Sequence, residues 1–247
     1  MKTKLTLFVA VIAVALVGTG CSSLDKGLLA YYPFNGNALD ESGNGQNGQL
    51  KGVSLVVDRH GENNAAYSFL PRNNSYIEVP ESENLPWVNM QTISVWLKMR
   101  VENSPEKGAN VVIRNYQDNA GSLSGWSLHL LNLNDDGSTF IEWICGGRGS
   151  FRMLCPIKRG DWFNITVQNK ADTFEVYING VLKKSQQMPP SRKRPNKVSL
   201  LIGGWTQTKL GGEGSFNGEI DDVRIYNRAL SAEEVKALYD LEKPKAK

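Results

Sequence analysis

Short stretches in which apolar and polar residues alternate are the feature that most constrains the fold of this chain. Ile93, Val95 and Leu97 fall on one face of an extended segment, and residues 173–178 repeat the alternation. A period of two is typical of β-strands that bury one face. The 24 glycines, ten prolines and several Asn-rich stretches supply tight turns between the runs. The pattern predicts an antiparallel sheet protein.

The number of these runs predicts one large two-sheet domain over residues 28–240, with neither an internal repeat nor a long linker. Apolar residues make up 40% of the chain and charged residues 21%, which excludes global disorder. Asn179 and Gly180 form a two-residue turn that tolerates positive φ, so we expect a hairpin over Phe174–Lys183. The expected strands are 28–34, 67–69, 76–79, 92–101, 111–114, 126–133, 140–145, 151–155, 163–168, 173–178, 198–202 and 218–226.

One helix is expected near the end of the chain. Ser231 is a natural N-cap, and Glu234 three residues later completes a capping box. Val235, Leu238 and Tyr239 share one helical face, which we expect to pack on the edge of the sheet sandwich. Residues 241–247 are expected to form a flexible tail.

The first 20 residues have the pattern of a bacterial signal peptide. Lys2 and Lys4 precede an apolar stretch of 13 residues, Leu5–Val17. A membrane-spanning helix needs roughly 20 apolar residues, so this stretch is too short for a permanent anchor. We expect residues 1–20 to be cleaved off.

The residues after the apolar stretch predict a lipid anchor. The small residues before Cys21, and Ser22 after it, resemble a lipoprotein lipobox, in which the cysteine is acylated and becomes the mature N-terminus. Residues 21–27 would then be a lipidated spacer that ties the domain to the cell envelope, at the outer membrane in a two-membrane host. Gly18 replaces the leucine usual in lipoboxes, so plain secretion is the alternative.

Charge gives no support to nucleic-acid binding. Removing residues 1–20 leaves 26 basic against 25 acidic side chains, so the mature protein is almost neutral. The single basic cluster, Arg192–Lys197, is either a solvated loop tip or a contact for acidic polysaccharide or lipid phosphate.

Several segments together resemble the laminin-G-like domains of the concanavalin A-like lectin/glucanase superfamily. They are Leu29–Phe34 with the Asn- and Gly-rich turns to Gly48, Ala65–Phe69, Tyr76–Val79, Thr92–Lys98, Gly160 and Trp162, Tyr177 with Asn179 and Gly180, and Ile220–Leu230. The resemblance spans the mature chain and implies an all-β, two-sheet antiparallel jelly roll with a short C-terminal helix. It does not imply one activity, because this fold hosts lectins, adhesive modules, glycoside hydrolases and lyases.

A structural calcium ion is the cofactor that the resemblance implies. Relatives often hold calcium between the first loop and the last strand, which points to Asn37, Asp40 and Asp221 here. Ca²⁺ takes about six to eight oxygen ligands, and a loop rich in Gly and Asn can present several of them. Asp221 also lies where the alternation of the last strand breaks, so we expect a β-bulge there. The alternative is that Asp40 caps a turn and Asp221 pairs with Arg224 or Arg228.

A catalytic carboxylate pair is not expected. Glu219 and Asp221 resemble the start of the E-x-D-x-x-E signature of laminarinase-type glucanases, but Arg224 stands at the third position. Arginine cannot supply a titratable proton, so the acid/base partner is missing. Glu142 is the remaining carboxylate that we regard as worth testing.

A carbohydrate-binding face needs exposed aromatic rings beside planar polar groups, because sugar rings stack on the former and hydrogen-bond to the latter. The residues that fit this description are Tyr116, Trp126, Arg148 and Trp205. Trp143 shares its strand face with apolar residues, which favours burial.

Cys145 and Cys155 flank a predicted hairpin. In an oxidising compartment two thiols on neighbouring strands can form a disulfide, and we expect one here. Two buried free thiols are the alternative.

These features favour a lipid-anchored, extracytoplasmic lectin-like domain that binds a glycan or another surface partner without catalysis. The alternatives are a polysaccharide-degrading enzyme, which would need a sheet face lined with carboxylates or with Tyr, His and Arg, and a structural or adhesive protein with a flat face poor in aromatic residues.

Overall fold

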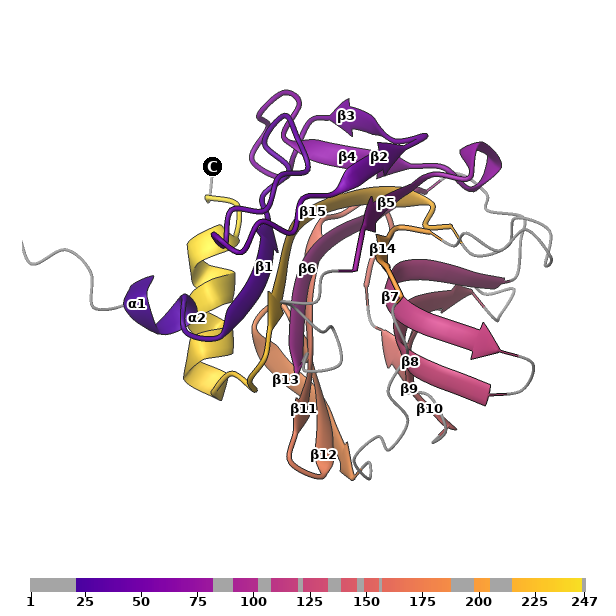
Figure 1. Ribbon diagram of the computed structural model, residues 1–247. Helices are drawn as coiled ribbons and strands as arrows, with labels where there is room; N and C mark the ends of the chain where they lie inside the picture. The colour runs from indigo at the N-terminus through magenta and orange to yellow at the C-terminus, as the bar shows by residue number, and fades with distance from the viewer. Residues whose placement is uncertain are drawn as a thin grey trace, which may run out of the picture.

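Two antiparallel β-sheets pack face to face, and helix α2 (Ala232–Glu242) covers the outer face of one of them (Figure 1). The computed structural model describes residues 21–81, 91–101, 108–119, 122–132, 139–145, 149–155, 157–187, 198–204 and 215–245. The predicted two-sheet sandwich with one C-terminal helix is confirmed. The predicted signal segment and the Arg192–Lys197 cluster lie outside the described residues.

The first sheet has eight strands in the order β13-β12-β11-β6-β15-β4-β3, and β1 pairs with β15 as well. Its strands are β1 (Leu28–Tyr32), β3 (Ser54–Val56), β4 (Ala66–Phe69), β6 (Thr92–Met99), β11 (Phe163–Lys170), β12 (Thr173–Ile178), β13 (Val181–Gln187) and β15 (Gly218–Tyr226).

The second sheet has seven strands in the order β10-β9-β8-β7-β14-β5-β2. Its strands are β2 (Gln49–Lys51), β5 (Tyr76–Val79), β7 (Gly108–Asn119), β8 (Ser122–Asn132), β9 (Thr139–Cys145), β10 (Gly149–Cys155) and β14 (Leu200–Ile202). Two short helical segments, α1 (Cys21–Leu24) and the 3₁₀ helix η1 (Pro71–Asn73), complete the described elements.

The core lies between the sheets and follows the alternation seen in the sequence. Ile93, Val95 and Leu97 of β6 are fully buried there, together with Leu128 and Ile141 from the other sheet. Burial of such side chains removes apolar surface from water, which drives the two sheets together.

The predicted hairpin at Asn179 and Gly180 is confirmed. Both residues have positive φ, 52° and 73°, and they join β12 to β13. A Cβ at Gly180 would lie 2.9 Å from the Cβ of Tyr239, so the glycine also allows α2 to approach the turn.

The predicted bulge in β15 is confirmed too. The register with β6 shifts between Asp221 and Arg224, and Asp222 has a φ of 39°. On its other edge β15 pairs with β4 before the bulge and with β1 after it. The bulge therefore lies where one edge of the strand changes partner.

Helix α2 starts at the predicted capping box. The Ser231 hydroxyl accepts a hydrogen bond from the backbone N–H of Glu234, whose carboxylate accepts one from the N–H of Ser231. Val235 and Leu238 pack with Tyr226 of β15, so the helix covers a sheet face, not the edge that we predicted. The helix also continues to Glu242, two residues past the predicted end of the domain. No helix among the described residues is long and apolar enough to cross a bilayer.

The strands β2 and β3 were not predicted. Each has three residues, and those of β2 are all exposed. A run this short shows no readable alternation, and a strand with no buried face has no apolar period at all.

The predicted disulfide is wrong. Cys145 pairs with Gly149 next to the turn, whereas Cys155 pairs with Thr139 at the other end of the hairpin. The two cysteines are therefore six residues apart along the hairpin. This separation corresponds to about 20 Å, whereas a disulfide needs Cα atoms roughly 4.4–6.8 Å apart. Cys155 is a free, buried thiol, and burial raises its pKa to about 12.

Candidate functional site

Five polar side chains gather on the outer face of the seven-stranded sheet, and we call them the polar cluster. Their positions alternate with core residues such as Leu128 and Ile141, which fixes the face on which they lie. In the register of the sheet Arg114 is opposite Ser127, His129 is opposite Glu142, and Glu142 is opposite Arg152. The polar cluster consists of Arg114, Ser127, His129, Glu142 and Arg152.

Glu142 lies at the centre of the polar cluster. Arg152 Nε donates to Glu142 Oε1 over 2.6 Å, and His129 Nδ1 lies 3.5 Å from Glu142 Oε2. On its other side His129 Nε2 hydrogen-bonds to the Ser127 hydroxyl at 2.5 Å. The imidazole thus stands between a hydroxyl and a carboxylate.

Most of the polar cluster is buried although it belongs to an outer face. Ser127, His129 and Glu142 are 2%, 5% and 4% exposed, whereas more than half of the Arg152 side chain is accessible. Burying a polar group without a hydrogen bond is unfavourable. Among the described residues His129 Nδ1 makes no hydrogen bond, and the group that it faces is the Glu142 carboxylate at 3.5 Å.

The Glu142 carboxyl is held in its ionised form. Burial alone would raise its pKa, but the neighbouring His129 imidazole and the hydrogen-bonded Arg152 guanidinium outweigh burial and lower the pKa below its ordinary value. An ionised carboxylate accepts hydrogen bonds and is not a proton donor at neutral pH.

The described carboxylates of this face do not form the pair that a glycosidase needs. The described acidic side chains here are Glu142 on β9 and Glu78 on β5, and the strands β8, β7 and β14 lie between them. Four strand spacings amount to about 19 Å. Retaining and inverting glycosidases hold their two carboxyl groups roughly 5–9.5 Å apart.

The structure tests one of the four predicted sugar-binding residues. Trp126 is 5% exposed and stacks on Trp143 in the core, with ring centroids 5.6 Å apart, so it is not the exposed platform that we predicted. Trp126 lies two residues before Leu128 in β8, so both side chains point to the core face of the sheet. Arg148 and Trp205 lie outside the described residues, as does the side chain of Tyr116.

Sequence reasoning identified Glu142 but missed Ser127 and His129. The signal was present, because both residues alternate with Trp126 and Leu128 along one strand and so had to lie on the opposite face. The contact of His129 with Glu142 needs the register between β8 and β9, which strand patterns alone do not fix.

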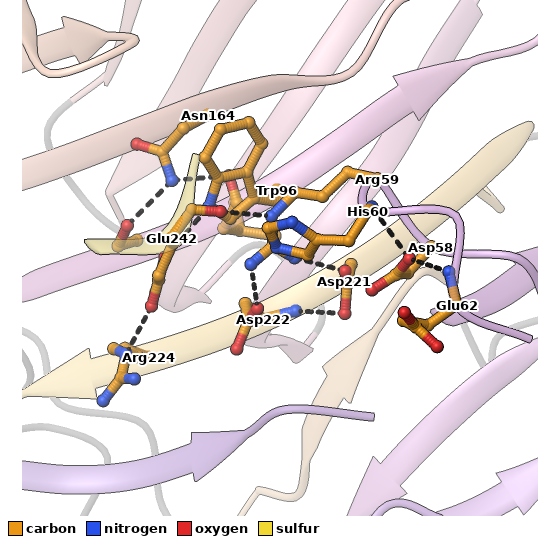
Figure 2. Close-up of polar contacts among 12 residues, drawn as sticks. Asp58, Arg59, His60, Glu62, Trp96, Asn164, Asp221, Asp222, Arg224 and Glu242 are labelled. Atoms are coloured by element: carbon orange, nitrogen blue, oxygen red, sulfur yellow. Dashed lines mark hydrogen bonds and ion pairs between the residues drawn. The ribbon is translucent and has the colours of Figure 1, made fainter. Parts of the chain in front are cut away.

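A second polar group lies between the eight-stranded sheet and α2 (Figure 2). Arg59 binds the carboxylates of Asp221 and Asp222, with a distance of 2.5 Å from Nη2 to Asp222. The Arg59 guanidinium also lies over the Trp96 ring, 4.8 Å from its centroid. The bulge in β15 is what presents two successive carboxylates to one guanidinium.

Glu242, the last residue of α2, completes this group. It accepts hydrogen bonds from Trp96 Nε1 at 2.9 Å and from Arg224 Nε at 2.6 Å. All the charged side chains concerned are buried or nearly so. We call the set the ion network, and it consists of Arg59, Asp221, Asp222, Arg224 and Glu242.

The ion network holds a proton near neutral pH. Burial, and then the charge of Asp222, raise the pKa of Asp221 to about 8 and that of Glu242 to about 7, against the opposing effect of the guanidinium groups. Two guanidinium ions can neutralise two of three carboxylates, so the third keeps its proton. The network joins the Arg59 segment and α2 to the sheet.

The residues predicted to bind calcium have other partners in the structure. Asp40 accepts three backbone hydrogen bonds, each 2.9 Å long, and Asp221 binds Arg59. Asn37 accepts a hydrogen bond from the N–H of Leu39. Within the described residues no group of three or more His, Cys, Asp or Glu could hold a metal ion. A calcium ion bound here would have to share these oxygens with their present partners, and the calcium site stays a prediction.

The residues of the incomplete glucanase signature also have ion-pair partners. Glu219 binds Lys98 at 3.0 Å, and Arg224, which stands at the third position, binds Glu242. Both pairs lie on the α2 side of the eight-stranded sheet, away from the polar cluster.

Solved structures with the same fold include a domain of an enzyme and the binding domains of toxins. Domain 4 of AbnA, a GH43 extracellular arabinanase from Geobacillus stearothermophilus solved in complex with arabinotriose, is 23% identical, with a TM-score of 0.61 over 86% of this chain and 98% of that chain. The binding domain of Paraclostridial Mosquitocidal Protein 1 is 21% identical, with a TM-score of 0.67 over 88% of this chain and 53% of that chain.

A third similar structure is the binding domain of botulinum neurotoxin DC in complex with rat synaptotagmin II, which is 15% identical, with a TM-score of 0.63 over 88% of this chain and 52% of that chain. The chain therefore spans about half the length of the toxin binding domains. At these identities the likeness shows the fold.

No curated protein matches the chain. A laminin-G family model, described as Concanavalin A-like lectin/glucanases superfamily, matches residues 71–236, which is most of the chain and extends from η1 into α2. The chain belongs to the concanavalin A-like lectin/glucanase superfamily.

Proposed function

We propose that this protein is a lipid-anchored, extracytoplasmic glycan-binding domain that binds its ligand at the polar cluster without catalysing a reaction. The observation that carries the proposal is the polar cluster on one sheet face, where the exposed guanidinium of Arg152 is held by the buried carboxylate of Glu142 beside His129. Planar polar groups of this kind hydrogen-bond to sugar hydroxyls and fix the orientation of a ligand.

Three features of the polar cluster support binding. Arg152 and Glu142 hold each other through a charge-assisted hydrogen bond, which gives a rigid donor and acceptor pair. More than half of the Arg152 side chain is exposed, so a ligand can reach its guanidinium group. The side chains come from adjacent strands of one sheet, so the backbone ladder holds them in place and little entropy is lost when a ligand binds.

The similar arabinanase domain, which was solved with arabinotriose, gives a first choice of ligand class to screen. The lipobox-like sequence at Cys21 supports an address at the cell envelope, where polysaccharides are the abundant partners.

A catalytic role is the second candidate, and one observation favours it. His129 lies between the Ser127 hydroxyl and the Glu142 carboxylate, the order of groups found in nucleophile–base–acid triads. Against this role, Ser127 is 2% exposed and therefore poorly placed to attack a substrate.

Binding of oligosaccharides to the domain tests the proposal. A glycan array with the unlipidated domain identifies a ligand, and calorimetry then compares the wild type with Glu142→Gln. We expect the substitution to weaken binding by about tenfold or more, because a charge-assisted hydrogen bond is worth roughly 1.5–3 kcal/mol.

The control is Glu219→Gln, which breaks a comparable ion pair with Lys98 on the other sheet and should leave affinity unchanged. Thermal melts show that each variant is folded. Equal affinity of wild type and Glu142→Gln would move the site away from the polar cluster. Turnover of the bound glycan that disappears in Glu142→Gln would instead establish the catalytic alternative.

A further inference from the structure

The segment that we expected to be a spacer is fastened to the domain. Leu24 is 5% exposed and packs with Leu230, Val235 and Leu238 in the cluster beneath α2. A free spacer would leave this leucine in water, so its burial stabilises the docked position of the N-terminal segment.

Arg228 ties the same segment down through its main chain. Its Nη2 donates to the carbonyl oxygen of Ser23 and its Nε to that of Lys26, each over 2.7 Å. The same guanidinium pairs with both carboxylate oxygens of Glu234 in the first turn of α2, at 2.7 and 2.8 Å. One side chain thus links the N-terminal segment to the helix.

Gly27 closes the docked segment. Its carbonyl oxygen accepts a hydrogen bond from the N–H of Asn227, and its φ is +74°. A Cβ at this position would lie 2.5 Å from the Asn227 Oδ1, so only glycine fits without a shift. Residues 23–27 are therefore part of the folded domain.

This docking leaves little chain between a lipid and the protein. Only Ser22 separates Cys21 from Ser23. Two residue steps span at most about 7 Å. Lipid attached to Cys21 would hold the docked segment, and with it α2, close to the membrane surface.

The layers of the fold then determine what faces away from the membrane. Helix α1 lies beside α2 on one side of the molecule, and β7 to β10 lie on the other side, with the eight-stranded sheet between them (Figure 1). A helix and two packed sheets separate the two sides by on the order of 20 Å.

We propose that the lipid on Cys21 holds this domain directly on the membrane with α1 and α2 toward the lipid surface, so that the polar cluster is presented on the side away from it. The partner of the α1 and α2 side is a lipid bilayer. The inference rests on the proposed lipid anchor, and it does not depend on which glycan binds.

Energy transfer to labelled lipids tests this orientation. The lipidated protein is placed in vesicles that carry acceptor-labelled head groups, and a donor is attached to a single introduced cysteine, in a Cys145→Ser background. Lys236→Cys labels the exposed side of α2, and Leu154→Cys labels the outer face of β10, where the leucine is 55% exposed. Cys155 is buried and stays unlabelled in the folded protein.

We expect several-fold stronger transfer from position 236 than from position 154. A Gly/Ser insertion of about ten residues between Ser22 and Ser23, a flexible coil of roughly 18 Å, should remove the difference. Equal transfer from both positions in the uninserted protein would overturn the proposal, and so would a difference that survives the insertion.

Mass spectrometry of the N-terminal peptide distinguishes a failure of the proposed lipid anchor from a failure of the proposed orientation. A Cys21 without lipid would refute the anchor and the orientation together, whereas a lipidated Cys21 with equal transfer would refute the orientation alone. The glycan titrations use the unlipidated domain, so their outcome is independent of both.

Discussion

Glu242 joins three parts of the chain that are far apart in sequence. It ends α2 and accepts hydrogen bonds from Trp96 of β6 and Arg224 of β15. Its neighbour in the ion network, Arg59, binds Asp221 across 162 residues. The sequence shows that Asp221 lies at a bulge, but it shows no pattern that would select Arg59 over Arg224 or Arg228 as its partner. Such a choice depends on tertiary packing.

The ion network gives the stability of this protein a pH dependence. The folded protein holds one proton on Asp221 or Glu242, whose pKa values are about 8 and about 7, whereas the unfolded chain releases that proton near pH 4. This contribution to stability is complete below the unfolded pKa and is lost as pH rises through 7 to 8. The free energy of unfolding should therefore fall, by on the order of 4 kcal/mol, between about pH 5 and pH 8, because one proton contributes about 1.4 kcal/mol per pH unit.

The variant Glu242→Gln isolates this effect. Glutamine keeps one acceptor oxygen, so it can accept from Trp96 or from Arg224 at their present positions but not from both, and only two carboxyl groups then remain for two guanidinium groups. Urea unfolding at several pH values should give a shallower decline for Glu242→Gln than for the wild type. Parallel declines would show that the proton is not held in the ion network.

At the scale of elements, most strands could be predicted from the sequence, whereas strand partners could be predicted only where a short turn joins two strands. Ile93, Val95 and Leu97 of β6 face the core between the sheets, whereas Ser94 and Trp96 are buried on the opposite face, and this difference between the two faces produces the alternation in the sequence. The hairpin at Gly180 was readable because positive φ restricts the residue type. The disulfide failed because the loop between β9 and β10 places Cys145 opposite Gly149, and loop geometry sets such a register.

Helix α2 provides the prediction at this scale. Replacing Ser231 by alanine removes the side-chain acceptor for the N–H of Glu234 and should lower the free energy of unfolding by about 1 kcal/mol. Chemical denaturation measures the change, and Lys236→Ala at an exposed helix position is the control. Glycan affinity should stay the same in Ser231→Ala, because α2 and the polar cluster lie on opposite sides of the sandwich. A change in affinity would couple the helix to the site.

At the scale of the whole molecule, the two outer faces have different roles. The face of the eight-stranded sheet is covered by α2, the docked N-terminal segment and the ion network. The face of the seven-stranded sheet carries the polar cluster. Family resemblance predicted the jelly roll, but the polar cluster requires side chains from four strands in register, and only the three-dimensional structure shows them together.

The two histidines of this chain allow the most direct test of the proposed site. His129 belongs to the polar cluster, whereas His60 is exposed next to Arg59 on the α2 side (Figure 2). NMR spectra of the histidine rings, recorded while a bound oligosaccharide is titrated into the unlipidated domain, report on both faces at once. We predict that the ring signals of His129 shift to saturation while those of His60 stay in place. Saturating ligand that shifts only His60, or neither ring, would contradict glycan binding at the polar cluster.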